Sequence, residues 1–177
     1  MGAKLVFPER KMKRSIADNQ VNIGLKCDYI RVRDEGGLIR LSAKIHAEKG
    51  GKMTDQKEVD VEVSDYDKTV RILEATGLVF NGYQETLRET WEYEEAEVEI
   101  DIWPGLLPRL EIEADSEDRV RVVSDKLELD WSKKFFYAMP ELYAKVYELG
   151  IDGVLEKTSN LTFEKNPFEG LQANHNI

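Results

Sequence analysis

Charged side chains recur at every second position in two short segments of β-forming residues. The segment RLEIEAD carries Glu111 and Glu113 two residues apart, and the segment YIRVR carries Arg31 and Arg33 at the same spacing. Alternate side chains of a β-strand point to opposite faces of the sheet. In each segment the charges therefore share one face, and the aliphatic side chains share the other.

A sheet face that carries both arginines and carboxylates has a specific chemistry available to it. Guanidinium groups bind phosphate oxygens in a bidentate manner, and clustered carboxylates bind hard divalent cations such as Mg²⁺ or Mn²⁺. A sheet curled with this face inward would bury the charges, which is costly unless they pair, stay hydrated or bind a ligand. The pattern then indicates a site for a polyphosphate with its metal. The alternative is an ordinary antiparallel sheet whose charged face is simply solvated.

The same division of faces extends along the chain. Basic side chains dominate the ionic face early, acidic ones follow, and Arg88 is basic again. Its members besides the four charged residues named above are Arg40, Lys44, Glu58, Asp60, Glu62, Arg88, Glu97, Glu99, Asp101 and Arg109. Arg40 and Arg109 lie near predicted turns and so belong to the rim of a site or to solvent. Glu97 and Glu99 are interpreted as partners of Arg88, with a role as metal ligands as the alternative.

Hydrophobic periodicity predicts the elements that position these charges. Alternation predicts strands over 20–33, 38–46, 57–63, 83–93, 97–103 and 109–115. Helical spacing predicts helices over 65–76, 117–129 and 140–150. Turns are indicated by DEGG, by EKGGK at 48–52 and by WPGLLP, whereas the basic stretch 1–19 is ambiguous and the tail 157–177 has no clear pattern.

Length and composition fit one globular domain over 1–177. The chain has 177 residues, of which 41% are hydrophobic, enough for a buried core. No apolar run approaches the ~20 residues that span a bilayer, and the N-terminus lacks the apolar region of a signal peptide. These features predict a cytoplasmic protein without a membrane partner.

The charge balance and the reactive residues exclude several kinds of site. Lys and Arg number 25 against 35 acids, a net charge of −10, which disfavours long nucleic acid as a partner. His46 and His175 are isolated, which disfavours a histidine-based or zinc site. The single cysteine, Cys27, is interpreted as a small buried thiol. Arg14, in a basic run, is interpreted as solvated, with a position in the site as the alternative, and Tyr143 and Tyr147 as core residues.

Taken in order, the segments YIRVR, IRLSAK, KEVDVEV, ILEATGL, QETLRE and EIDIWPGLLPRLEIE resemble the CYTH superfamily over roughly residues 29–130. This group is named for class IV adenylate cyclase and thiamine triphosphatase, and its members are also called triphosphate tunnel metalloenzymes. No single motif is specific, but the ordered set is. The resemblance implies an α+β fold in which an antiparallel β-barrel encloses a triphosphate tunnel and helices pack outside.

The resemblance also implies roles for individual residues. Those matching the phosphate-binding positions are Arg31, Arg33, Lys44 and Arg88, of which Lys44 and Arg88 are also expected to be catalytic. Those matching the acidic positions, expected to hold Mg²⁺ or Mn²⁺, are Glu58, Asp60, Asp101, Glu111 and Glu113.

One departure from the family concerns the N-terminus. The signature strand of the superfamily reads E-x-E-x-K, and this motif is absent from the sequence. The first residues, MGAKL, resemble the end of the helix that normally follows that strand. The expectation is therefore a barrel without its first strand, with an unpaired edge that a second copy of the chain could fill as a homodimer.

The function implied by the resemblance is a metal-dependent phosphohydrolase that cleaves an inorganic, nucleoside or thiamine triphosphate. Two alternatives stay open. One is a class IV adenylate cyclase, which makes cyclic AMP and pyrophosphate, and the other is a non-catalytic module that binds polyphosphate or a nucleotide.

Overall fold

The computed structural model describes residues 2–45, 57–135 and 138–174. The predicted turn at 48–52 and the two histidines, His46 and His175, lie outside these residues. Among the described helices, none combines the length and the apolar composition needed to cross a membrane.

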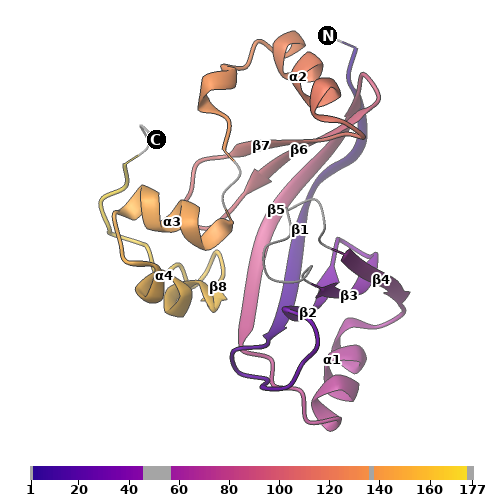
Figure 1. Ribbon diagram of the computed structural model, residues 1–177, viewed down its shortest axis with the longest axis vertical. Coiled ribbons are helices and arrows are strands. Elements are labelled where there is room, and N and C mark those ends of the chain that lie inside the picture. Colours follow the sequence, from indigo (N-terminus) through magenta and orange to yellow (C-terminus); the bar gives the residue numbers. More distant parts are fainter. Residues whose placement is uncertain (1, 46–56, 136–137, 175–177) are drawn as a thin grey trace. The chain divides into compact units, whose positions relative to one another are not determined.

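Eight strands and four α-helices make up the described chain (Figure 1). The strands are β1 (Lys4–Asp18), β2 (Tyr29–Asp34), β3 (Ile39–Ile45), β4 (Lys57–Val63), β5 (Gly82–Tyr93), β6 (Ala96–Ile102), β7 (Arg109–Glu113) and β8 (Asn160–Leu161). The helices are α1 (Tyr66–Ala75), α2 (Glu117–Lys126), α3 (Met139–Tyr147) and α4 (Ile151–Thr158), with a short 3₁₀ helix, η2, at Trp131–Lys133.

The strands follow the order β4-β3-β2-β1-β5-β6-β7, and β8 pairs with β5 in parallel. The pairings of β1 with β2, β2 with β3, β3 with β4, β5 with β6 and β6 with β7 are antiparallel. The predicted α+β class is confirmed. Over the described residues the strand order is an open path that ends at β4 and β7, rather than the closed barrel that the resemblance implied.

The chain forms two compact units. Unit 1 comprises Met1–Lys11, Thr86–Thr158 and Phe163–Ile177, and unit 2 comprises Met12–Glu85 and Ser159–Thr162. Strands β1 and β5 each contribute residues to both units.

In unit 2, helix α1 packs on the apolar face of β1 and β2, whereas Val59 and Val61 of β4 are exposed. Val32 of β2 and Ala17 of β1 are fully buried on this face. The helix begins after Asp65, one residue later than the predicted cap Ser64, because the Asp65 carboxylate accepts a hydrogen bond from the Lys68 amide at 2.9 Å. A 2.7 Å hydrogen bond between the hydroxyls of Tyr66 and Ser15 joins α1 to β1.

In unit 1, helix α2 packs on the apolar face of β6 and β7. The core here consists of Tyr93, Ala96, Val98 and Val123, with Ile112 packed against it. Because these strand residues are separated by polar ones, burying them under α2 leaves the charged side chains on the opposite face.

The loop between β6 and β7 is fixed by helix α3. The hydroxyl of Tyr143 donates a 2.6 Å hydrogen bond to the carbonyl of Pro104, and that of Tyr147 donates to the carbonyl of Gly105. Phe168 stacks on both tyrosine rings, with centroids 4.4 and 4.8 Å away. Phe168, which lies in the tail without a clear sequence pattern, therefore belongs to the packed core of unit 1, whereas residues 159–162 of the tail belong to unit 2.

The structure corrects the prediction for the N-terminus. Residues 4–18 form the long strand β1, which lies between β2 and β5, and not the end of a helix. The first strand is thus present, and only the E-x-E-x-K motif is absent. The apolar residues that stabilise this strand are few, Met12 and Ala17 among them, which is why alternation did not reveal it.

Two smaller predictions are wrong. The expected strand begins at Tyr29, not at residue 20, because residues 19–28 form turns and bends. Cys27 lies in that segment and is only half-buried. Its partial burial, with the charge of Asp28 nearby, raises the pKa of the thiol above its usual value.

Candidate site of arginines and carboxylates

Strand register in unit 2 places the predicted residues on one face. Residues directly opposite each other on neighbouring strands share a face. Arg31 lies opposite Ser42, which lies opposite Asp60, and Lys44 lies opposite Glu58. The ionic face predicted for this part of the chain is therefore formed.

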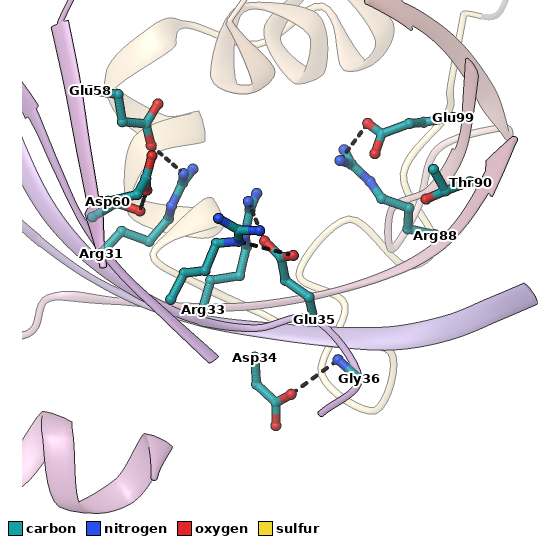
Figure 2. A network of polar contacts seen from close by, with 12 residues as sticks. Arg31, Arg33, Asp34, Glu35, Gly36, Glu58, Asp60, Arg88, Thr90 and Glu99 are labelled. Carbon is teal, nitrogen blue, oxygen red and sulfur yellow. Dashed lines mark hydrogen bonds and ion pairs between the residues drawn. The ribbon is translucent and has the colours of Figure 1, made fainter. Parts of the chain in front are cut away.

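The arginines of this face pair with nearby carboxylates (Figure 2). Arg31 donates from Nη2 to Glu58 Oε1 at 2.6 Å, and its side chain is 13% exposed. Asp60 accepts a hydrogen bond from the hydroxyl of Ser42. Glu58 and Asp60 were predicted as metal ligands. In the structure Glu58 neutralises Arg31 of β2, and Asp60 accepts a hydrogen bond from Ser42 of β3.

In unit 1 the register again aligns the charges. Arg88 of β5 lies opposite Asp101 of β6, which lies opposite Arg109 of β7. One pleat further along, Glu99 lies opposite Glu111. The strands that α2 holds by their apolar faces therefore present arginines and carboxylates together on the other face.

Arg88 is the centre of this cluster. It forms a bidentate pair with Asp101, with Nε to Oδ1 at 2.6 Å and Nη2 to Oδ2 at 2.7 Å. It also pairs with Glu99, as Figure 2 shows, and reaches Glu111 Oε2 at 3.3 Å. Arg109 approaches Asp101 at 3.2 Å and Glu111 at 3.7 Å. Charge-assisted bidentate pairs of this kind are the strongest hydrogen bonds available to side chains.

The protonation of the cluster follows from burial and from these pairs. Burial alone would lower the pKa of Arg88, but the hydrogen bonds and charge of Asp101 raise it above its usual value. Burial would raise the pKa of Asp101, but Arg88 and Arg109 hold it below its usual value. Burial of Glu99 outweighs the attraction of Arg88, and it raises the pKa of Glu99 to about 7. Asp101 is thus a fixed anion, and Glu99 titrates near neutrality.

A divalent cation fits three carboxylates of unit 1. Glu99, Glu111 and Glu113 each offer a carboxylate oxygen, and these oxygens lie within 4.8 Å of one another. Such hard oxygen donors are the ligands that Mg²⁺ and Mn²⁺ prefer.

Of the metal ligands predicted in unit 1, two belong to this group of carboxylates and one does not. Glu111 and Glu113 belong to the three-carboxylate group, whereas Asp101 is engaged by Arg88 and Arg109. The sequence favours Glu99 as a partner of Arg88, with a metal ligand as the alternative, and the structure gives it both positions. The signal that could have identified it is its place on the same strand face as Asp101, but its position opposite Glu111 depends on a strand register that the sequence does not supply.

Strand β1 adds arginines to the ionic face. In unit 1, Arg10 donates to Thr90 Oγ1 at 3.1 Å, and in unit 2, Arg14 lies opposite Arg33. Glu9 is exposed and alternates with Arg10, so it points to the opposite face. The E-x-E-x-K motif itself is absent from the sequence of β1.

Comparison with protein families supports the resemblance to the CYTH superfamily. The family model of the CYTH domain matches residues 24–147. A search of the curated proteins finds no significant match.

Solved structures with the same fold come from archaea and bacteria. A conserved hypothetical protein from Pyrococcus furiosus is 15% identical, with a TM-score of 0.62 over 80% of this chain and 86% of that one. A Pyrococcus horikoshii protein is 17% identical, with a TM-score of 0.57 over 74% and 80%. A candidate adenylate cyclase from Vibrio parahaemolyticus is 14% identical, with a TM-score of 0.63 over 81% and 86%. At these identities the likeness concerns the fold.

Proposed function

Because the chain belongs to the CYTH domain family, we propose that it is a divalent-metal-dependent phosphohydrolase that cleaves a triphosphate. The substrate class is inorganic triphosphate or a triphosphate attached to a nucleoside or thiamine. The observation that carries this proposal is the cluster in unit 1, where Arg88 lies against Glu99 and Glu111 and three carboxylates converge.

In this proposal Glu99, Glu111 and Glu113 would hold Mg²⁺ or Mn²⁺. The bound cation would supply charge neutralisation for phosphoryl oxygens and orientation for the attacking water. Arg88 and Arg109 lie beside these carboxylates, and their guanidinium groups are available to the same phosphoryl oxygens of the substrate.

The protein's own contribution is positioning and electrostatics. Asp101 is 1% exposed and holds Arg88 by two hydrogen bonds, so the guanidinium is oriented before a ligand arrives. A guanidinium group that is already oriented stabilises the charge of a transferring phosphoryl group without a cost of reorganisation. In unit 2, Arg31, Arg33 and Lys44 are proposed to bind phosphoryl oxygens, with Arg31 released from Glu58 for this purpose.

A second candidate is a module that binds a triphosphate without cleaving it. The composition of β1 favours this candidate, since this strand lacks the E-x-E-x-K motif whose acidic residues supply metal ligands in the family. Fewer carboxylates leave fewer ligands for a catalytic cation.

Product analysis tests the proposal. The purified chain would be incubated with Mn²⁺ and either inorganic triphosphate or ATP, and the products separated. Orthophosphate release supports the phosphohydrolase, and cyclic AMP with pyrophosphate would identify the class IV adenylate cyclase instead. Saturable binding of triphosphate without any product would favour the binding module. A cytoplasmic location is part of the same proposal, because nucleoside triphosphates are cytoplasmic metabolites.

A further inference from the structure

Arg109 lies between two carboxylates of unit 1 that have different roles. Its Nη2 donates to Asp101 Oδ2 at 3.2 Å, whereas Glu111 Oε2 lies 3.7 Å away, beyond the range of a hydrogen bond. Asp101 is the buried anchor of the cluster, and Glu111 is one of the three carboxylates that fit a divalent cation. A small shift of Arg109 toward Glu111 would place a positive charge on a ligand that the cation needs.

The ring of Trp103 supports the guanidinium group of Arg109. Arg109 Cζ lies 5.8 Å from the centroid of the Trp103 ring. A guanidinium group within about 6 Å of a tryptophan centroid is attracted by the π electrons, and the attraction increases where water is excluded. Water is largely excluded here, because Trp103 is 3% exposed and the side chain of Arg109 is 17% exposed. The ring therefore favours one position of a long side chain that has many rotamers.

Helix α3 fixes the loop that carries Trp103. Trp103 follows β6 directly, and Arg109 is the first residue of β7. Between them, the amide of Leu106 donates to the carbonyl of Trp103 at 3.1 Å and closes a turn. Gly105 has a φ of 82°, and a Cβ atom added there would lie 2.8 Å from the hydroxyl of Tyr147. The hydrogen bonds that the two tyrosines of α3 donate to this loop therefore hold it in one closely packed conformation.

We propose that Trp103 is a positioning residue for the carboxylate site of unit 1. By holding Arg109 on Asp101, it keeps the guanidinium group away from Glu111 and leaves that carboxylate available to a divalent cation. The inference rests on the proposed function, because it concerns the same three carboxylates. It adds Trp103, and the loop that holds it, to the residues that set the affinity for the cation.

The two partners of this contact should have opposite effects on cation binding. Removal of Arg109 takes away a positive charge beside Glu111, which favours a second cation there. Removal of the Trp103 ring leaves the arginine in place and allows it to pair with Glu111, which disfavours the cation. A role of Trp103 in stability alone would not depend on Arg109.

Calorimetric titration of the full chain with Mn²⁺ measures these effects. Arg109→Gln should tighten Mn²⁺ binding by at least about threefold. Trp103→Leu should weaken it by about three- to tenfold, and Trp103→Phe, which keeps an aromatic ring, by less than about twofold. In the Arg109→Gln background, Trp103→Leu should have no further effect, since no arginine remains to be positioned. Trp131→Leu is the matched control and should leave Mn²⁺ affinity unchanged, because Trp131 contacts Arg121 and Lys134 instead.

The comparison of the two backgrounds separates positioning from general destabilisation, and circular dichroism establishes that each variant is folded. If Trp103→Leu does not fold, Tyr147→Phe removes only the hydroxyl that holds the loop, and it should weaken Mn²⁺ binding in the wild type but not in Arg109→Gln. Equal losses in both backgrounds, an equal loss in Trp131→Leu, or unchanged affinity in Trp103→Leu would overturn the inference and leave the proposed function standing. Affinity that does not rise in Arg109→Gln would also overturn it. A wild type that binds no Mn²⁺ would overturn the inference together with the proposed function.

Discussion

Asp101 is almost inaccessible to water and depends on two arginines for its charge. Only 1% of it is exposed, and its oxygens receive three hydrogen bonds from Arg88 and Arg109. A buried ion pair contributes little when compared with a hydrophobic pair, but removal of one partner leaves an uncompensated charge. The arrangement is therefore costly to break and specifies where the Arg88 guanidinium lies.

Replacement of Arg88 should show this cost. Arg88→Met is expected to lower the free energy of unfolding by about 3 kcal/mol, because Asp101 stays buried with one weaker partner. Urea denaturation followed by circular dichroism measures the change. The double variant Arg88→Met with Asp101→Leu should recover most of the loss.

Replacement of an arginine in an exposed ion pair is the control for Arg88→Met. Arg119 pairs with Glu95, whose side chain is 81% exposed. Arg119→Met is expected to cost at most about 1 kcal/mol, as exposed ion pairs do. Equal losses in Arg88→Met and Arg119→Met would contradict the account of the buried cluster.

The carboxylates of β7 should control the response to metal. Glu113→Gln removes a charged ligand oxygen from the group formed with Glu99 and Glu111. We expect it to weaken Mn²⁺ affinity by at least about tenfold and to abolish metal-dependent turnover, with the fold unchanged. Calorimetric titration with Mn²⁺ and a phosphate-release assay measure the two effects. Glu95→Gln, an exposed carboxylate outside the group, is the control, and indistinguishable Mn²⁺ affinities of the two variants would contradict the assignment.

The sequence alone predicts which face of the sheet many single residues occupy. It does not predict which of these side chains contact each other. Because the two-residue period of a strand is local, the sequence alone assigns Arg31, Arg88 and Glu111 to the ionic face. The contact of Glu35 with Arg33 and Arg40 depends on how a turn closes. The approach of Glu99 to Glu111 depends on strand register, which is a property of two distant segments.

At the scale of elements, the hydroxyl of Tyr66 connects helix α1 with β1. It lies 2.7 Å from the hydroxyl of Ser15, and Tyr66 is 8% exposed. Burial raises the pKa of Tyr66 to about 12, from an ordinary value of 10.0. The folded protein therefore retains a phenolic proton that the unfolded chain releases at lower pH.

This difference predicts a loss of stability at alkaline pH. The contribution is fully present below pH 10.0 and is lost as the pH rises toward about 12. It should amount to about 1–3 kcal/mol in the wild type and be absent from Tyr66→Phe. Urea denaturation across this pH range measures the difference, with phenolate absorbance reporting the late titration. Parallel pH profiles of the two proteins would show that Tyr66 does not titrate late.

Elements with strong hydrophobic periodicity were predicted well, and elements held by tertiary contacts were not. Helix α1 and strands β3 to β7 each carry an apolar side that their sequence displays. Strand β1 consists largely of basic residues, because much of it lies on the ionic face, and Pro8 further weakens a strand prediction. The helix α4 and the packing of Phe168 follow from contacts within unit 1 that no local pattern encodes.

At the scale of the whole molecule, each of the two units has an apolar strand face that a helix covers in part and an opposite face of alternating charges. In unit 1 the cover is α2, and in unit 2 it is α1. The predicted homodimer stays a prediction, and its original argument is weaker because β1 occupies the position of the strand thought to be missing. Sedimentation of the purified chain would determine its oligomeric state.

The central claim is that this chain binds a triphosphate together with a divalent cation. Thermal unfolding of the full chain, with inorganic triphosphate and Mn²⁺ added singly and together, tests it most directly, because a ligand held only by the native state raises the midpoint by mass action. We predict a larger rise with both ligands than the two single rises combined, since the cation neutralises the phosphate charge beside Glu111 and Glu113. An unchanged midpoint under all three conditions, at ligand concentrations well above the micromolar range, would contradict the account.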